Sequence, residues 1–342
     1  MNNVKDQLIT DKFAVYNGDC MAVLPTLPDE SIDLSVYSPP FAGLYNYSSS
    51  EYDFSNCATK EEFLAQYEFL VEQVARVTKA GRITAVHCTD IHDNRCFLWD
   101  FPHEIIRIHQ KYGFEYRNRI TIFKEPLKVR MRTMVQSLMH KFVVEDTTKC
   151  FTAMPDYMLI FTKQGENKVP VTHPKGFTEY FGETPILENM VEAFNNSIGE
   201  ELATKMSAQE IWNYLTGVYK HHDDPKTNKL SHYIWRRYAS PTWDDIRIDN
   251  VLPFQDSKEE DDEKHVHPLQ LDVIDRIVEM YSNPNEVVLT PFAGVGSEVY
   301  SPVSLGRRAI GIELKDSYYK QMLLNLKAAD TRFKKAAQLT AF

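Results

Sequence analysis

Short apolar runs alternate with helical stretches at both ends of this chain, and two of the runs lead directly into unusual loops. Residues 32–37 precede Ser38-Pro39-Pro40-Phe41, and residues 286–289 precede a Pro-Phe-Ala-Gly-Val-Gly loop at 291–296. Apolar runs of this length between helices are typical of buried strands in a parallel α/β sheet. Ligands bind to such sheets beyond the carboxyl ends of the strands. The two loops are therefore predicted to line one shared cleft, although they are far apart in the sequence.

The remaining pattern places these loops in a Rossmann-like α/β fold, a mostly parallel sheet with helices on both faces. Apolar residues recur with helical spacing at 60–78, at 101–112 and from 268 onwards. Two β-rich runs, 117–123 and 157–162, are expected to form an antiparallel edge on that sheet.

The alternation stops between residues 163 and 243, where the only helix that the pattern indicates is at 208–219. We therefore expect an inserted region at 163–243. It would separate a first part of the α/β domain, residues 1–162, from a second part, residues 244–342. A chain of 342 residues is long enough to bury a large core for such a domain.

The composition is that of a globular protein, with 43% hydrophobic and 25% charged residues. No apolar stretch approaches the ~18 residues of a membrane span, and the polar first dozen residues lack the apolar core of a signal peptide. The five cysteines form no C-x-x-C pair, so neither a disulfide framework nor a zinc site is expected. A cytoplasmic location is expected instead. The net charge of −10 argues against coating nucleic acid through bulk electrostatics but leaves room for local basic patches.

The second loop has the features of a nucleoside-binding turn. Gly294-x-Gly296 lies between a strand and a helix, and Glu313 ends the next strand, where an acid can accept hydrogen bonds from both ribose hydroxyls. Val299 stands where the dinucleotide fingerprint has its third glycine, and the Lys-Ser/Thr pair of a phosphate loop is missing. These features favour a ligand without a pyrophosphate, and S-adenosyl-L-methionine (SAM) fits. Glycines that only turn the chain are the alternative.

The first loop is suited to holding a planar base. Prolines fix φ and donate no backbone hydrogen bonds, so the Pro39 carbonyl and the Ser38 hydroxyl have fixed directions and few local donors. We expect the base to stack on Phe41 while these two acceptors bind its exocyclic amine. They would favour a pyramidal nitrogen in line with the sulfonium methyl and stabilise its growing positive charge. The proton is expected to leave after methyl transfer, to water. A plain proline-rich turn is the alternative.

Taken together, the two loops resemble those of the amino-methyltransferases that modify DNA on adenine N6 or cytosine N4. The resemblance covers about 13–161 and 243–326, in the permuted β order with the catalytic loop first. It implies a Rossmann-like SAM-dependent methyltransferase fold, SAM as cofactor, and a catalytic role for the tetrapeptide Ser38, Pro39, Pro40 and Phe41. The residues that it implies for cofactor binding are Asp19, His267, Thr290, Pro291, Phe292, Gly294, Gly296 and Glu313.

Two positions depart from the family pattern. Thr290 stands where the SAM loop usually begins with Asp; it can still form a hydrogen bond with the cofactor but lacks the charge. The tetrapeptide begins with Ser38 rather than Asp or Asn. In the family, serine at this position favours cytosine N4 over adenine N6 but does not decide between them.

The resemblance implies double-stranded DNA as partner, with the target base flipped out of the duplex. A basic segment at 124–141, expected to be a loop at the mouth of the cleft, and a basic-aromatic cluster at 235–238 are candidate phosphate contacts. Target recognition would fall to the region 163–243. The DNA-binding candidates are Lys124, Lys128, Arg130, Arg132, Arg236 and Arg237.

Other functions remain open at this point. The same chemistry could act on RNA or on a free nucleoside, and a degenerate module could bind SAM or DNA without turnover. A nicotinamide dehydrogenase ranks last because the third glycine is missing. Interaction with a membrane is not expected, whereas a homodimer and a restriction endonuclease partner are left open. Four histidines without metal-ligand spacing are interpreted as structural or surface groups: His87, His92, His103 and His109.

Overall fold

The computed structural model describes residues 4–40, 54, 57, 59–92, 97–133, 136–183, 206–219, 224–257 and 268–339. Two of the predicted site residues, Phe41 and His267, lie outside these ranges. The backbone of Arg132 is described but its side chain is not.

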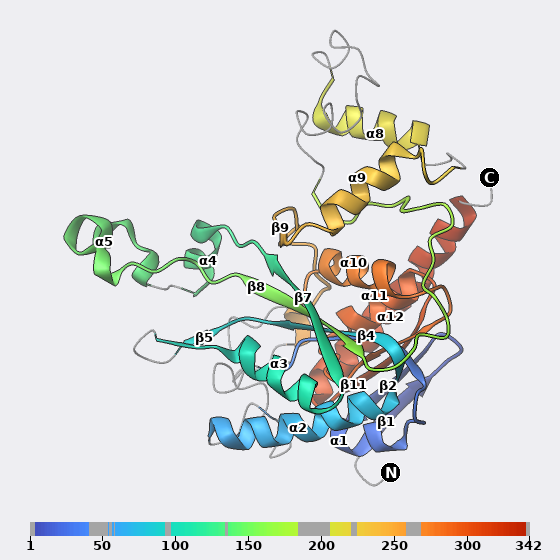
Figure 1. Ribbon diagram of the computed structural model, residues 1–342, viewed down its shortest axis with the longest axis horizontal. Helices are drawn as coiled ribbons and strands as arrows, with labels where there is room; N and C mark the ends of the chain where they lie inside the picture. The colour runs from blue at the N-terminus through green and yellow to red at the C-terminus, as the bar shows by residue number, and fades with distance from the viewer. Residues whose placement is uncertain are drawn as a thin grey trace.

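A sheet with nine described strands lies at the centre of the molecule, in the order β1-β2-β11-β10-β3-β4-β8-β7-β9 (Figure 1). From β2 to β4 neighbouring strands are parallel, while β8 runs antiparallel to both β4 and β7. This confirms the mostly parallel sheet with an antiparallel edge. The strands are β1 (Val4–Ile9), β2 (Phe13–Gly18), β3 (Ile32–Tyr37), β4 (Thr78–Cys88), β7 (Phe114–Ile122), β8 (Asp156–Lys163), β9 (Thr242–Trp243), β10 (Val287–Thr290) and β11 (Arg308–Glu313), and a separate pair is formed by β5 (Ile91–His92) and β6 (Leu98–Trp99).

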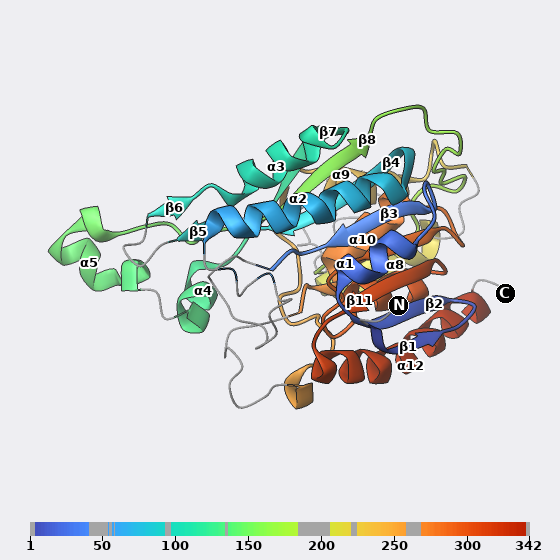
Figure 2. The same ribbon diagram turned by 90° about the horizontal axis from the view of Figure 1, so that it is seen from below.

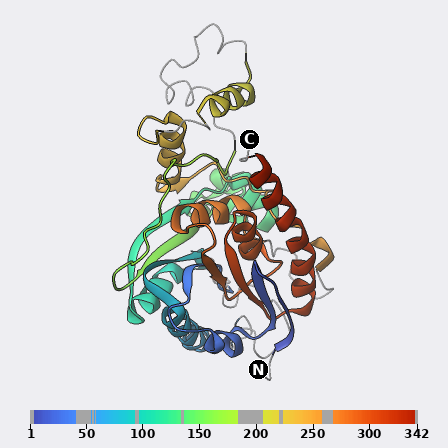
Figure 3. The same ribbon diagram turned by 90° about the vertical axis from the view of Figure 1, so that its right-hand side faces the viewer.

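Helices cover both faces of the sheet, as the alternating pattern predicts (Figure 3). Helices α2 and α3 pack on one face, where Tyr37 of β3 is buried, and α10 packs on the other, where Leu34 and Val36 are buried. The helices are α1 (Cys20–Val23), α2 (Lys60–Val77), α3 (Phe101–Lys111), α4 (Pro126–Thr133), α5 (His140–Glu145), α8 (Ala208–Tyr219), α9 (Lys229–Tyr238), α10 (Leu271–Tyr281), α11 (Ser297–Ser304) and α12 (Asp316–Leu339).

The segment between β8 and β9 has a small apolar core of its own. Residues of α8 and α9 pack together there with Phe177 and Phe181. Helix α8 has the predicted bounds, but α9 is a second helix that the pattern did not indicate; its N-cap is Asn228, whose side chain accepts a hydrogen bond from the Ser231 amide. The boundaries at 163 and 243 remain a proposal.

The basic segment at 124–141 differs from the prediction of a loop. It contains α4 and the start of α5, which lie away from the sheet on the left of Figures 1 and 2. Within the described parts of the chain, no helix has the length and apolar character needed to cross a membrane.

Candidate active site

The two loops singled out in the sequence leave neighbouring strands. Strands β3 and β10 are parallel and adjacent, with Leu289 opposite Ser35, so their carboxyl ends lie side by side. Beyond these ends the rings of Tyr37 and Phe292 come within 6.1 Å of each other, centroid to centroid. The chain continues from β3 towards β4 on one side and from β10 towards β11 on the other, which makes this the topological switch point of the sheet. The prediction that the two loops lie together is confirmed.

The loop after β10 has the backbone that its glycines permit. Gly294 and Gly296 have φ of 51° and 95°, in the left-handed region that favours glycine. A Cβ on Gly296 would lie 2.6 Å from Met322 Cγ, whereas one on Gly294 would meet none of the described residues within 4 Å. The loop is therefore closed on the side of α12 and open beside Gly294, where a ligand can approach the backbone.

Glu313 is attached to this loop through its carboxylate. Its Oε2 accepts a hydrogen bond from the Gly294 amide at 2.7 Å, and its Oε1 accepts one from the Lys315 amide at 2.8 Å. Asp19 follows the neighbouring strand β2 and caps α1, accepting a hydrogen bond from the Met21 amide at 2.9 Å. The acid at the end of β11 and the acidic turn after β2 thus lie at the same edge of the sheet as the glycine loop.

Carboxyl groups gather around the loop. Burial, with the charge of Glu313 added, raises the pKa of Glu298 in α11 to about 8. Burial also raises the pKa of Asp19, and the pKa of the adjacent Cys20 thiol is raised by burial and by Asp19 and Glu313. With a pKa of about 8 Glu298 is largely uncharged at neutral pH, so attraction of a cation and repulsion of a polyphosphate come from the carboxylates of Asp19 and Glu313.

Thr290 lies at the start of the loop and is buried. Its hydroxyl oxygen has no hydrogen-bond partner in the described part of the chain. Because buried polar groups normally have partners, a ligand is one candidate partner for this hydroxyl.

Ser38, the first residue of the proline-containing loop, begins a chain of polar contacts. Its Oγ lies 3.1 Å from His87 Nδ1. The other ring nitrogen, Nε2, lies 3.2 Å from Asp156 Oδ2. This is within ion-pair distance, but the angle does not meet hydrogen-bond criteria. Lys124 Nζ donates to Asp156 Oδ1 at 2.6 Å. These residues come from the ends of β3 and β4, the start of β8 and the segment after β7, all at one edge of the sheet.

Asp156 is buried, yet it is held in its ionised form. Burial alone would raise its pKa, but the charge of Lys124 and the contact with His87 outweigh it and lower the pKa of Asp156 well below its usual range. A buried carboxylate with two such partners is a fixed negative charge beside the imidazole.

His87 was interpreted as a structural or surface group; it is buried, which excludes the surface alternative, and it contacts Ser38. The sequence contained a signal for it, because His87 lies at the end of a predicted strand, as Ser38 does. Asp156 was missed because an acid at the start of an antiparallel strand resembles an ordinary turn residue. His109 agrees with its structural interpretation: it is fully buried, stacks on Phe161 and lies 3.1 Å from the Tyr37 hydroxyl.

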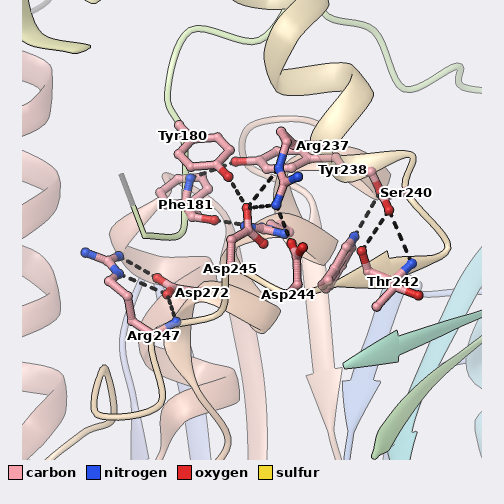
Figure 4. A network of polar contacts seen from close by, with 12 residues as sticks. Tyr180, Phe181, Arg237, Tyr238, Ser240, Thr242, Asp244, Asp245, Arg247 and Asp272 are labelled. Atoms are coloured by element: carbon pink, nitrogen blue, oxygen red, sulfur yellow. Dashed lines mark hydrogen bonds and ion pairs between the residues drawn. The ribbon is translucent and has the colours of Figure 1, made fainter. Parts of the chain in front are cut away.

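The candidate DNA-binding residues fall into different settings. Lys124 is paired with Asp156, so its charge belongs to the site rather than to an open basic surface. Arg237 forms ion pairs with Asp244 at 2.5 Å and with Asp245 at 3.1 Å (Figure 4). Lys128 on α4 and Arg236 on α9 are exposed. Arg130 lies half-buried on α4.

The N6/N4 DNA methylase family model matches residues 32–324, and the chain belongs to this family. It is 25% identical over 314 residues to the Type II methyltransferase M.BamHI of Bacillus amyloliquefaciens and 26% identical over 309 residues to M.BglII of Bacillus subtilis. The matches cover 92% and 89% of this chain but only 57% and 66% of the two relatives. The chain thus spans less than two thirds of the length of either relative.

Solved structures share the fold. The PvuII DNA methyltransferase, described as cytosine-N4-specific, has a TM-score of 0.57 at 14% identity, covering 97% of this chain and 96% of that one. A putative DNA modification methylase from Thermus thermophilus, complexed with S-adenosyl-L-methionine, has a TM-score of 0.55 at 18% identity, covering 92% and 95%. These likenesses establish that the chain has the α/β methyltransferase fold.

Proposed function

We propose that this chain transfers the methyl group of SAM to an exocyclic amino group of a flipped base in double-stranded DNA. The observation that carries the proposal is the placement of two loops beyond the adjacent strands β3 and β10. The Ser38-Pro39-Pro40 turn supplies acceptors for an amine, and the 290–296 loop supplies open backbone for a nucleoside. Membership of the DNA methylase family supports the same substrate class.

The residues around the glycine loop fit SAM. Glu313 would hold the ribose hydroxyls, since each carboxylate oxygen can accept a further hydrogen bond beside the one from the backbone. The unpartnered Thr290 hydroxyl and the open face of Gly294 would contact the nucleoside or the amino acid part. The carboxylates of Asp19 and Glu313 suit a ligand with a sulfonium and an ammonium group. When bound, SAM supplies an electrophilic methyl group on a cationic sulfur.

The first loop would bind and orient the base. Ser38 Oγ and the Pro39 carbonyl would accept the two amine hydrogens, which draws the nitrogen lone pair out of the ring system. Fixed acceptors of this kind also stabilise positive charge that grows on the nitrogen during the reaction. We include Phe41 as the stacking surface and His267 as a cofactor contact on the resemblance alone.

We favour cytosine N4 as the target, because the tetrapeptide begins with serine and because the PvuII enzyme of the same fold is cytosine-N4-specific. Adenine N6 is the second candidate, since the family includes both reactions. The surfaces proposed for DNA are α4, with Lys128, Arg130 and Arg132, and the exposed Arg236. A homodimer and a restriction endonuclease partner remain predictions from the sequence.

The function is tested by incubating the protein with methyl-labelled SAM and mixed-sequence DNA, then identifying the modified nucleoside by mass. We expect label in N4-methylcytosine or N6-methyladenine and none in 5-methylcytosine. Label in RNA but not in DNA would overturn the proposed substrate, and no transfer to any nucleic acid would overturn the activity.

Two variants test the division of labour between the loops. Ser38→Ala is expected to lower the methyl-transfer rate about 100-fold, the size of one lost transition-state hydrogen bond, while SAM affinity stays the same. Glu313→Ala is expected to weaken SAM binding, measured by calorimetry. If both variants lost SAM binding to the same extent, the assigned roles would be wrong.

A further inference from the structure

The contact chain from Ser38 through His87 to Asp156 goes beyond what the proposed function requires. An amine acceptor needs only a hydroxyl oxygen, yet here that hydroxyl is in contact with an imidazole whose far nitrogen faces a buried carboxylate. His87 and Asp156 are both buried. Placing a buried charge behind an imidazole costs desolvation free energy, which a merely structural polar contact does not need.

The ionised Asp156 determines the protonation of the imidazole. Because the carboxylate lies 3.2 Å from Nε2, the hydrogen of neutral His87 is favoured on that nitrogen. Nδ1 then carries a lone pair directed at Ser38 Oγ, 3.1 Å away. The Ser38 hydroxyl must donate its hydrogen to Nδ1, so its oxygen lone pairs remain to accept from a substrate.

We propose that His87, held by Asp156, is a positioning residue that keeps Ser38 in its acceptor orientation and takes up the proton released by the methylated amine. This rests on the proposed function. It replaces the expectation from the sequence that the proton passes directly to water.

The proton transfer balances as follows. The N–C bond forms as the C–S bond breaks, the electron pair of that bond goes to sulfur, and the amine nitrogen is left with one proton in excess. That proton moves to Ser38 Oγ while the hydroxyl proton of Ser38 moves to His87 Nδ1. The resulting imidazolium is stabilised by Asp156 and later releases its proton to solvent.

The other groups near this chain fit the role. Lys124 pairs with the second carboxylate oxygen of Asp156 and keeps that carboxylate ionised before the reaction. Cys88, next to His87 on β4, has a buried thiol whose pKa is raised well above its usual range, so it stays neutral. Asp90 and Arg119 add charges of opposite sign near Cys88. Among the described residues, His87 is the base in contact with the Ser38 hydroxyl.

Two substitutions separate positioning from proton uptake. In His87→Gln the amide oxygen can still accept from Ser38 but cannot take the proton, whereas His87→Ala removes both functions. We expect single-turnover methyl transfer to fall about 100-fold in the first, the lower end of general acid–base contributions, and further in the second, which also loses the acceptor for the Ser38 hydroxyl. SAM affinity should change less than twofold in both.

The pH dependence of methyl transfer distinguishes proton uptake by His87 from a purely structural role, which would not change it. Wild-type transfer should slow on acidification, because a protonated Nδ1 can no longer accept the hydrogen bond from Ser38. His87→Gln should lack this acidic limb. His109→Gln is the matched control, since it removes another buried histidine: it should lower the melting temperature but keep the limb.

A second readout needs no activity. Nitrogen NMR of the ring in SAM-free protein, assigned by the loss of the signal in His87→Gln, should show neutral His87 protonated on Nε2. A proton on Nδ1, or an acidic limb retained in His87→Gln, would overturn the inference. Absence of methyl transfer in the wild type would instead refute the proposed function and with it the proton-uptake role, while the NMR result would still decide the orientation of Ser38.

Discussion

Close packing of α11 on the sheet depends on one glycine that lies on a strand. The dinucleotide fingerprint places its third glycine on the helix, where this chain has the buried Val299. Across from it is Gly311 of β11, and a Cβ there would lie 2.5 Å from Val299 Cγ2. In this chain the glycine that allows close packing is therefore on the strand and not on the helix. The missing third glycine alone says little about the ligand, and the case for a cationic ligand rests on the carboxyl groups around the loop.

Gly311→Ala should therefore destabilise the protein. The added methyl group would overpack the contact with Val299 and shift α11, at a cost of about 1–3 kcal/mol. Thermal unfolding checks this. The matched control is Gly217→Ala on α8, where a Cβ would meet no atom of the described part of the chain within 4 Å. It should stabilise by up to about 1 kcal/mol because alanine is the better helix former. Equal effects of the two changes would contradict the packing argument.

Glu298 should make stability depend on pH. Its pKa is raised to about 8 in the folded state, above the value of about 4.3 for an unperturbed glutamate. The folded state binds this proton more tightly, so the stabilisation is fully present below about pH 4 and is lost as pH rises through about 8. The loss amounts to at most about 1.4 kcal/mol per pH unit.

Glu298→Gln should remove this dependence. The melting temperatures of the two proteins should approach each other near pH 5. Towards pH 8 the melting temperature of the variant should rise relative to that of the wild type. A constant difference between them across that range would show that Glu298 is already ionised in the folded protein.

At the level of secondary-structure elements, an ionic cluster joins α9, the segment after β9 and α10 (Figure 4). Asp245 accepts from the Tyr180 hydroxyl and pairs with Arg276 at 2.8 Å and with Arg237 at 3.1 Å. Arg276 is fully buried, and its guanidinium also lies 5.0 Å from the Trp243 ring centroid. The proposed recognition region is therefore fixed to the catalytic sheet by a buried charge network.

Asp245→Asn should cost about 3–5 kcal/mol, because it leaves the buried Arg276 without its counter-ion. The neighbouring Asp244 provides the control, since it pairs with Arg237 but is exposed. Asp244→Asn should cost no more than about 1 kcal/mol. Urea unfolding of both variants measures the difference, and a small effect of Asp245→Asn would mean that the network is dispensable.

Elements with a clear apolar period were predictable, and elements held by polar or local contacts were not. The bounds of β3 and α8 agree with the predictions, because apolar spacing defines both. Helix α9 was missed although its buried Leu230, Tyr233, Ile234 and Tyr238 follow helical spacing, because only two of the four are aliphatic and its start depends on the Asn228 cap. Strand β1 was missed because its side chains are largely exposed and its backbone pairs with β2.

For the whole molecule, the sequence predicted that the loops after β3 and β10 lie together. It did not predict which other residues would contact them. Ser38 and Glu313 were found because each follows a strand in a recognisable motif. His87 and Asp156 belong to no such motif, and only the pairing of β4 with β8 brings them together. Long-range register of this kind is decided by the assembled sheet, which explains why the contacts of His87 with Ser38 and with Asp156 escaped sequence reasoning.

Charge is distributed unevenly over the molecule. The chain has a net charge of −10, yet α4 presents basic residues in a part that lies away from the sheet (Figures 1 and 2). Because the net charge of the chain repels DNA, a basic helix such as α4 should carry much of the attraction. Binding should then depend on salt through a few local contacts.

The double change Lys128→Gln with Arg130→Gln should weaken DNA binding to the same extent for all sequences. It should also reduce the slope of log Kd against log salt concentration by up to about 1.8, since each phosphate contact contributes about 0.9. Fluorescence anisotropy over a salt series measures both quantities. Lys320→Gln with Lys327→Gln removes the same charge from exposed positions on α12, far from α4 in Figures 1 and 2, and should leave the slope unchanged. If the two double variants lowered the slope equally, the attraction would come from overall charge, and α4 would not be the DNA-contacting element.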